Sequence, residues 1–190
     1  MADRGRPDTR TESAGDPSRR SHIHFLNAKL PRKRNIAQGL LRNEDGEILL
    51  CELAYKLEWD LPGGVVDPKE SPAACVVREI SEELGVALGV ERLVVVNWLP
   101  PWRGWDDAVL FLYDLGVVSR SFTDDLTLLP REIKAVHWVA PEAVGEHVAP
   151  YTARMLEQVL VAVDGEATPT GAGPAYPAYL ENSELPGSMR

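Results

Sequence analysis

The chain has 190 residues, a length typical of one domain, and 44% of them are hydrophobic, which is enough to form a core. This composition excludes collagen-like, disulfide-scaffold and wholly disordered proteins. The formal net charge is −9, yet residues 1–34 carry nine Lys and Arg against four Asp and Glu, and the remaining residues carry eleven against twenty-five. Such an acidic body argues against nucleic acid as a partner, and if it handles phosphates we expect it to need cations.

Cysteine usage and apolar segments indicate the compartment. Cys51 and Cys75 lie in apolar stretches, and residues 1–22 contain no apolar segment of the kind found in signal peptides. No apolar run approaches the ~20 residues that span a bilayer. We therefore expect a cytoplasmic protein that has no membrane partner.

Composition divides the chain into three segments. Residues 1–22 consist mostly of Arg, Asp, Ser, Thr, Gly and Pro, which predicts a disordered basic arm. Residues 23–163 are expected to form a single domain. Residues 164–190 are rich in Pro and Gly, which predicts a flexible tail.

Alternation and turn signals predict the elements of the central domain. Strands are expected at 35–42 and 47–55, joined by an Asn-Glu-Asp-Gly turn, and 59–64 is expected to be a loop. A helix is expected at 72–84, followed by strands at 92–98, 107–118 and 133–139 and helices at 141–147 and 150–163. Strands interleaved with helices indicate a layered α/β domain.

The helix at 72–84 has the clearest start and stop signals. Ser71 is a suitable N-cap, Pro72 suits the first helical position, and Gly85 suits a left-handed C-terminal stop. At 100° per residue, four apolar side chains fall within about 60° of one another, and we expect them to pack on the sheet. These are Ala73, Val77, Ile80 and Leu84.

Three carboxylates lie on another side of the same helix. Glu79, Glu82 and Glu83 have i, i+3, i+4 spacing, so they stack over successive turns and repel one another unless a cation lies between them. Grouped carboxylates suit Mg²⁺ or Mn²⁺. For a lone pair of glutamates in a helix, a solvated acidic face is the usual explanation, because charged faces are common.

The residues around this cluster form a longer pattern. From Gly64, five residues lead to Glu70 and seven more lead to Arg78-Glu79-Ile80-Ser81-Glu82-Glu83-Leu84-Gly85-Val86. This is a full match to the Nudix box, whose seven fixed positions coincide by chance on the order of once in a billion starts. The chain therefore resembles the Nudix hydrolases over roughly residues 34–163. The resemblance implies a Nudix-type α/β/α sandwich with a mixed sheet.

The resemblance also implies an activity. Nudix hydrolases are pyrophosphohydrolases that cleave a diphosphate linkage in a nucleoside diphosphate derivative, using Mg²⁺ or Mn²⁺ as cofactor. The substrate is then a small nucleotide, and nucleotide sugars, ADP-ribose and nucleoside triphosphates all remain open. Many members form homodimers.

Carried onto this sequence, the family pattern assigns the metal to the helix. Glu79, Glu82 and Glu83 are the implied ligands, together with the main-chain carbonyl at Gly63 or Gly64. Glu82 and Glu83 are both eligible to accept the proton of the attacking water.

Other residues of the box have supporting roles. Arg78 cannot bind a metal because it stays protonated, so it is expected to pair with Glu70 and a helix carboxylate and to hold the ligands in place. Gly64 and Gly85 are expected to serve backbone geometry.

Outside the box, two features have both a functional and a structural explanation. Glu132, six residues before Trp138, resembles a late glutamate that some relatives use as base or ligand, and a surface salt bridge explains it equally well. Three tryptophans lie in or beside a loop rich in Pro and Gly, where they could stack a nucleobase or fill the open end of the sheet. These are Trp98, Trp102 and Trp105.

Two alternative functions use the same fold. An RNA 5′-end pyrophosphohydrolase is supported by the basic residues near the start of the chain, namely Arg19, Arg20, Lys29, Arg32, Lys33 and Arg34. A non-catalytic Nudix-fold module that senses a nucleotide is favoured by a degraded box, whereas this box is intact.

Overall fold

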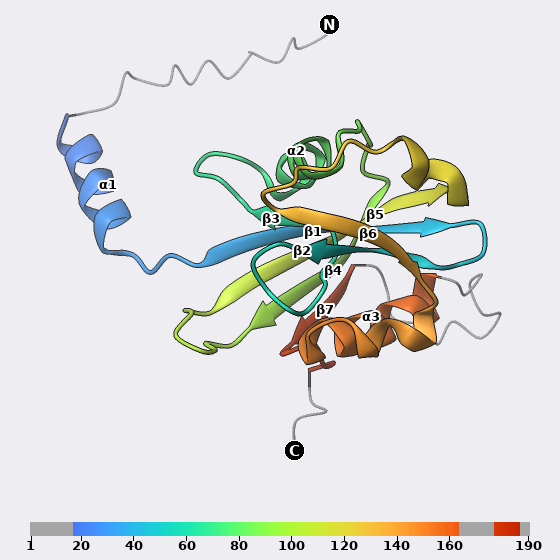
Figure 1. The fold of residues 1–190 in the computed structure, drawn as a ribbon. Coiled ribbons are helices and arrows are strands. Elements are labelled where there is room, and N and C mark those ends of the chain that lie inside the picture. Colours follow the sequence, from blue (N-terminus) through green and yellow to red (C-terminus); the bar gives the residue numbers. More distant parts are fainter. Residues whose placement is uncertain (1–16, 164–176, 187–190) are drawn as a thin grey trace, which may run out of the picture. The chain divides into compact units, whose positions relative to one another are not determined.

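A mixed β-sheet organises the chain from Lys33 onward. The computed structural model describes residues 17–163 and 177–186, and within them the sheet has seven strands (Figure 1). The strands are β1 (Arg34–Asn43), β2 (Ile48–Leu53), β3 (Gly63–Val65), β4 (Arg92–Leu99), β5 (Ala108–Val118), β6 (Ile133–Val139) and β7 (Ala178–Glu181). Their order is β6-β2-β1-β5-β4-β7, and β3 pairs with β1. β1 runs parallel to β5 and β4 parallel to β7, while the other pairs are antiparallel.

Helices cover the two faces of this sheet. Figure 1 shows α2 (Pro72–Leu84) on one face and α3 (Pro150–Val163) on the other. Successive residues of β2 point to opposite faces, so Leu49 packs in the core under α2 and Leu50 in the core under α3. Burial of both faces explains why the strands are apolar almost throughout. The predicted α/β/α sandwich is confirmed.

Most of the predicted elements are present, and three local predictions differ from the structure. Gly63–Val65, expected within a loop, forms the short strand β3 because its backbone pairs with Ala37 and Gln38 of β1. The expected helix at 141–147 is the short 3-10 helix η2 (Pro141–Glu146), and a second one, η1 (Arg120–Asp125), has no clear sequence signal. Elements of three or six residues are too short to show a period.

The ends of α2 follow the sequence signals, but its buried face differs. Ser71 Oγ accepts a hydrogen bond from Ala74 N at 3.2 Å, and Gly85 has the left-handed φ of 72°. Val77, expected in the core, is 36% exposed, whereas Glu83 is buried together with Cys75, Val76, Ile80 and Leu84. The buried face of α2 is therefore rotated toward the side that carries Glu83, because β3 offers polar partners there. A helical projection of apolar residues alone does not include such contacts.

The chain before Lys33 forms a separate unit. It contains α1 (Pro17–Lys29), so residues 17–22, expected to be disordered, are helical, and the boundary lies after Arg32 and not after residue 22. The stretch between Pro17 and Leu30 contains no Gly or further Pro, which permits a helix once Pro17 starts it. Residues 1–16 lie outside the described part. Within the described ranges, the helices are all too short or too polar to cross a bilayer.

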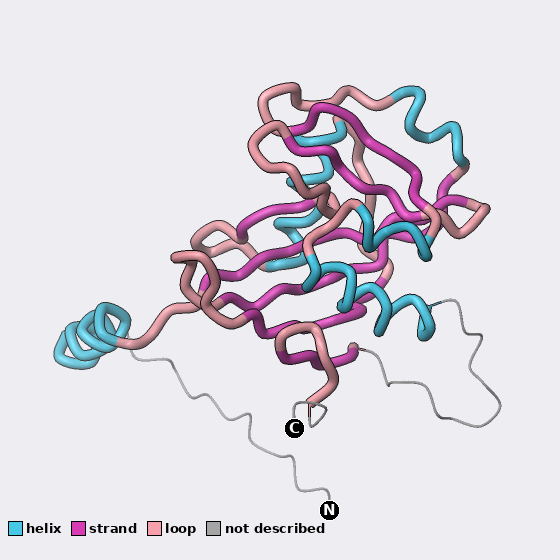
Figure 2. Tube along the Cα trace, turned by 60° about the horizontal axis from the view of Figure 1, so that its bottom comes forward, coloured by secondary structure: helices cyan, strands magenta, loops and turns pink. Residues whose placement is uncertain are grey.

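Part of the predicted flexible tail is a strand. β7 pairs with β4 beside α3, at the edge of the sheet (Figure 2). Ala178 and Leu180 are buried in the α3 core while Tyr179 is 49% exposed, an alternation too brief to recognise in the sequence. Residues 164–176 and 187–190 of the predicted tail lie outside the described residues.

A buried polar contact anchors this C-terminal segment. Asn97 of β4 is fully buried; its Nδ2 donates to Ser183 Oγ at 2.9 Å and its Oδ1 accepts from Ser183 N at 3.0 Å. Ser183 is also fully buried. Neither residue can turn to water, so each depends on the other for its hydrogen bonds.

Replacing Asn97 is expected to destabilise the fold. Asn97→Leu keeps the size of the side chain but leaves the buried Ser183 N–H without an acceptor, so the free energy of unfolding in urea should fall by about 1–3 kcal/mol. Tyr179→Phe, which removes only the exposed hydrogen bond to Glu181, is the control and should change it by less than about 0.5 kcal/mol. An Asn97→Leu protein as stable as the wild type would show that β7 is not anchored this way.

Candidate active site

The carboxylates of α2 lie directly against the main chain of β3. Gly63 N donates a 2.8 Å hydrogen bond to Oε2 of Glu83. A Cβ atom on Gly64 would lie 2.4 Å from Oε1 of Glu79, closer than real Cβ contacts come. Only glycine at position 64 leaves room for the Glu79 carboxylate where it now lies, so a larger residue there would push this carboxylate away from β3.

Strand β3 is held in place from its other side. Gly64 pairs with Ala37 of β1, and Pro62 O accepts a 2.9 Å hydrogen bond from Gly39 N. The loop before it is pinned by Asp60, whose carboxylate accepts from Gln38 Nε2 at 2.9 Å and from Lys56 Nζ at 2.6 Å. The glycine strand is therefore a fixed surface on which α2 rests.

Arg78 joins the loop before α2 to two of the helix carboxylates. Its Nε and second guanidinium nitrogen donate to both oxygens of Glu70, at 2.9 and 3.0 Å. Its remaining nitrogen donates to Glu79 at 3.0 Å and to Glu82 at 3.2 Å. The pair of Arg78 with Glu70 expected from the sequence is thus present, with two helix carboxylates bound in place of the one expected. The hydrogen bonds from Arg78 lower the pKa of Glu70 to about 2.

The three helix carboxylates differ in exposure. The Glu82 side chain is 54% exposed, the Glu79 side chain is 13% exposed, and Glu83 as a whole is 4% exposed. Burial, together with the charges of Glu79 and Glu132, raises the pKa of Glu83 to about 8, although the hydrogen bond from Gly63 N–H acts to lower it. Burial also raises the pKa of Glu79. The site therefore holds carboxylates close together in a place where little water reaches them to stabilise their negative charge.

The donor set fits a divalent cation. Three carboxylates on one side of a helix, next to the carbonyl-bearing strand Gly63–Val65, are the hard oxygen donors that Mg²⁺ and Mn²⁺ take. The buried Glu83 carboxyl has one backbone N–H to compensate its charge. In the part of the chain that the structure describes, no three His, Cys, Asp or Glu side chains converge on one point, and Arg78 holds the ends of Glu79 and Glu82.

Glu132 lies near this cluster. It precedes β6, its backbone carbonyl accepts from Ala54 N at 2.8 Å, and its carboxylate pairs with Arg131 at 3.1 Å. Burial is the main cause of the raised pKa values of Glu79 and Glu83, and the charge of Glu132 adds to both. The structure thus shows the surface salt bridge, and the charge of Glu132 also acts on the carboxylates of α2.

Cys75 is buried one turn before Glu79. Its Sγ lies 3.9 Å from Gly64 O, and Arg78 lies 3.5 Å from it. Burial and the charges of Glu70 and Glu79 raise the pKa of the Cys75 thiol to about 12. Such a thiol is a packing residue and a poor nucleophile.

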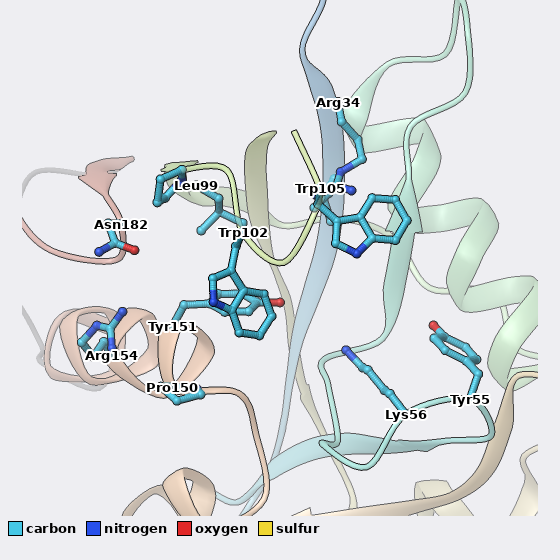
Figure 3. A pocket seen from close by; sticks show the side chains of 12 residues that line it. Arg34, Tyr55, Lys56, Leu99, Trp102, Trp105, Pro150, Tyr151, Arg154 and Asn182 are labelled. Carbon is cyan, nitrogen blue, oxygen red and sulfur yellow. The ribbon is translucent and has the colours of Figure 1, made fainter. Parts of the chain in front are cut away.

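A cavity of about 620 Å³ opens between the sheet and the start of α3, which contributes Pro150, Tyr151 and Arg154 to its wall (Figure 3). Ile36, which pairs with Val65 of β3, lies in its wall. Trp102 and Trp105 also line it, on a tight turn through Arg103 and Gly104 that both have positive φ. Mutual backbone hydrogen bonds of 3.0 and 2.9 Å between the two tryptophans close this turn.

Trp98, predicted with these tryptophans, has a different place. It lies in β4 and is absent from the cavity wall, and its indole N–H donates to Asp107 at 3.1 Å. Asp107 also pairs with Lys33, so the start of β5 is tied to the residue before β1. The strand predicted at 92–98 is β4 and continues through Leu99, so Trp98 lies in the strand and the loop begins after Leu99.

Sequence reasoning missed most of the cavity. Its wall includes Arg34, Tyr55, Lys56, Tyr151, Arg154 and Asn182, which come from four separate segments. Arg34 is among the basic residues that suggest RNA binding, yet its guanidinium lies 4.5 Å from the ring centre of Trp105. The one signal for this cavity in the sequence is a basic residue, Arg34, together with a loop rich in tryptophan. The two lie far apart in the chain, and only the pairing of β1 with β5 brings them together.

Comparison with known proteins agrees with this geometry. A family model described as the NUDIX domain matches residues 32–159. The MutT-like protein of Streptomyces ambofaciens is 34% identical over 128 residues, which are 67% of this chain and 75% of that protein. The nucleoside triphosphatase NudI of Escherichia coli is 33% identical over 126 residues, covering 58% of this chain and 84% of that protein.

Solved structures agree with the fold. The crystal structure of a MutT protein from Methanosarcina mazei superposes with a TM-score of 0.60 at 26% identity, covering 72% of this chain and all (100%) of that one. The family model spans more than half of the chain and includes the glycine strand, the Arg78 network and all three carboxylates of α2. This chain belongs to the Nudix hydrolase family.

Proposed function

We propose that this protein hydrolyses the diphosphate linkage of a small nucleoside diphosphate derivative, of the nucleoside triphosphate type, with Mg²⁺ or Mn²⁺ bound to α2. The observation that carries the proposal is the packing of Glu79 and Glu83 against the glycine strand β3, with a cationic and aromatic cavity next to it. The names of the relatives, a MutT-like protein and a nucleoside triphosphatase, support the substrate class.

Four groups would hold the metal, namely the carboxylates of Glu79, Glu82 and Glu83 and the carbonyl of Gly64. A divalent cation, when bound, neutralises the diphosphate oxygens and acidifies a bound water. Glu83 is fixed for this role by its hydrogen bond from Gly63 N, and Glu79 by its contact with Gly64. These two carboxylates lie against β3, whereas Arg78 must release at least one of the helix carboxylates that it holds before all three can meet one cation.

The attacking water must lose a proton to the chain. Glu82 is the most exposed of the three helix carboxylates and can turn toward solvent, while Glu83 is buried and fixed. Glu132 is a carboxylate outside the box whose charge contributes to the raised pKa of Glu83, after burial as the main cause. We therefore assign proton acceptance to Glu82, with Glu132 as the second candidate.

Arg78 acts through the carboxylates. Its guanidinium clamps Glu70 with two hydrogen bonds and reaches Glu79 and Glu82, so it sets the positions of two ligands. This bidentate geometry needs the planar fork of arginine.

The cavity favours a small nucleotide as the substrate, in preference to the 5′ end of an RNA. Trp102 and Trp105 offer aromatic faces on which a base can stack. Of the basic residues that suggested RNA binding, Lys33 pairs with Asp107 and Arg34 stacks on Trp105, so both belong to the domain and not to an arm. The intact carboxylates argue against a module that binds without cleaving.

Removing the negative charge of Glu83 is expected to abolish turnover. With a nucleoside triphosphate and Mg²⁺, the wild type should release pyrophosphate and a nucleoside monophosphate, and Glu83→Gln should lower kcat on the order of 100-fold or more. The melting temperature should stay nearly the same, because the amide oxygen can still accept from Gly63 N. Excess EDTA should stop the wild type and added Mg²⁺ should restore it.

Glu44→Gln is the matched control, since Glu44 is exposed in the turn between β1 and β2 and should keep wild-type rates. Wild-type turnover in Glu83→Gln, or full activity in EDTA, would falsify the proposed site.

Arg78 is expected to affect both metal use and stability. Arg78→Ala leaves Glu70, Glu79 and Glu82 without their shared cation, so the melting temperature should fall and kcat should drop about 10- to 100-fold. Arg78→Lys keeps the charge without the fork and should be intermediate, with a higher Mg²⁺ concentration needed for half-maximal activity. Arg120→Ala, which removes a surface pair with Asp45 and Glu47, is the control. An unchanged Mg²⁺ requirement in Arg78→Lys would contradict the positioning role.

A further inference from the structure

A tight turn after β7 lies against the end of β4. Glu181 N donates to Glu184 O at 2.9 Å, and Glu184 N donates to Glu181 O at 3.1 Å. Asn182 and Ser183, the two residues between them, have φ values of 51° and 66°. Positive φ at both central positions is the geometry of a type I′ turn, which favours Asn at the first position and Gly at the second. Ser183 stands where glycine would be unstrained, so the turn carries backbone strain.

Buried hydrogen bonds explain why a serine fits this strained position. Ser183 is fully buried, and its hydroxyl and N–H both bind the side chain of Asn97 in β4. A glycine would relieve the strain but would lose the bond to the hydroxyl. Asn97 Nδ2 also donates to Met155 Sδ of α3 at 3.7 Å. The serine therefore fixes the turn to the sheet and to α3 at the cost of strain.

The first corner of the turn faces the cavity. Asn182 lines the cavity of about 620 Å³, on the same side as Leu99 and Arg154 and opposite Tyr55 (Figure 3). Its backbone N–H donates to Trp98 O at 2.8 Å, one residue before Leu99. The turn thus holds one side chain in the cavity wall while the neighbouring side chain is locked into the core.

This arrangement exceeds what is needed to end an edge strand. The turn follows β7 and lies outside residues 32–159, the part that matches the family model. Strained residues persist where the surrounding structure holds them, and they gather at ligand-binding sites. Resting on the proposed function, we propose that the turn Glu181–Glu184 positions the bound nucleotide: Asn182 contacts it, and Asn97 and Ser183 are positioning residues that act through Asn182.

This role belongs to binding and not to the chemical step. β7 contributes Ala178 and Leu180 to the core under α3, whereas the carboxylates lie on α2, which covers the other face of the sheet (Figure 1). A contact so placed holds the nucleotide equally before and during the reaction. Its loss therefore raises KM and leaves kcat unchanged.

Removing the side chain of Asn182 tests the contact directly. Asn182→Gly keeps the turn, because Gly adopts a φ of 51° without strain. With GTP and ATP in the presence of Mg²⁺, this variant should raise KM on the order of 10-fold for at least one of the two, with kcat within about 2-fold of the wild type. A wild-type KM for both nucleotides would overturn the proposal.

A double-mutant cycle tests whether Asn97 acts through Asn182. Asn97→Leu should release the turn and raise KM on the order of 10-fold. Adding Asn182→Gly to it should raise KM by less than about 2-fold more, because both changes remove the same contact. Effects that multiply would contradict the positioning role. Ser183→Gly, which removes only the hydroxyl bond, replaces Asn97→Leu in the cycle if that variant does not fold, with a KM increase of about 2- to 5-fold.

Asn43→Leu is the matched control for lost stability. Asn43 is 2% exposed, accepts from Asp45 N and Glu47 N and donates to Glu47, in the turn between β1 and β2. This change should lower the melting temperature as Asn97→Leu does, yet keep the wild-type KM. An equal rise of KM in Asn43→Leu would show that KM follows stability alone, against the proposal.

Hydrogen exchange separates this proposal from the proposed function. In Ser183→Gly, peptides that contain residues 178–183 should exchange faster than in the wild type, and saturating GTP or ATP should slow them, because docking of the turn and nucleotide binding favour each other. If no triphosphate is hydrolysed but a nucleotide slows this exchange, the proposed function fails and the positioning role stands. If triphosphates are hydrolysed and neither nucleotide changes the exchange, the positioning role fails alone. Absence of both hydrolysis and protection overturns both.

Discussion

Contact between the carboxylates of α2 and the main chain of β3 is the interaction on which the site depends. Glu83 reaches the N–H of Gly63, and Glu79 occupies the space that a side chain at position 64 would fill. These contacts bury negative charge in a domain that is already acidic, which is unfavourable because the carboxylates lose contact with water. A backbone N–H and the Arg78 guanidinium compensate part of this loss. Arg78 in turn needs Glu70, which ties the loop before the helix to the helix itself. These contacts explain why the glycine, Glu70, Arg78 and the glutamates of α2 have the sequence spacing of the Nudix box.

Charge is distributed unevenly within the domain in a way that matches an anionic substrate. The carboxylates gather on α2, while the cavity next to them is lined by Arg34, Lys56 and Arg154. Lys56 is neutralised by Asp60, and the guanidiniums of Arg34 and Arg154 each have a buried Nε without a partner. A bound divalent cation would offset the excess negative charge of the α2 cluster, so that a phosphate could approach it. The overall negative charge of the chain therefore says little about what its active site binds.

Sequence reasoning located the carboxylate site and missed the cavity, for physical reasons. Ser71, Gly85 and the glutamates of α2 are contiguous in sequence, so caps and spacing were enough to place them. The helix projection misjudged Val77 because it counted apolar residues alone, whereas Glu83 is buried through a hydrogen bond to β3. The cavity joins β1, the loops after β2 and β4, α3 and the segment after β7, which only the strand order brings together. β7 itself depends on the Asn97 contact with Ser183, two residues far apart in the chain.

A crystal structure with Mn²⁺ is the most direct measurement of the central claim, that α2 and β3 form a divalent-metal site. The account predicts anomalous density about 2 Å from carboxylate oxygens of Glu79, Glu82 and Glu83 and from the carbonyl of Gly64. It also predicts that Arg78 keeps its two hydrogen bonds to Glu70 while it releases at least one helix carboxylate. Mn²⁺ bound elsewhere at saturating concentration, with Arg78 still holding both Glu79 and Glu82, would contradict the account.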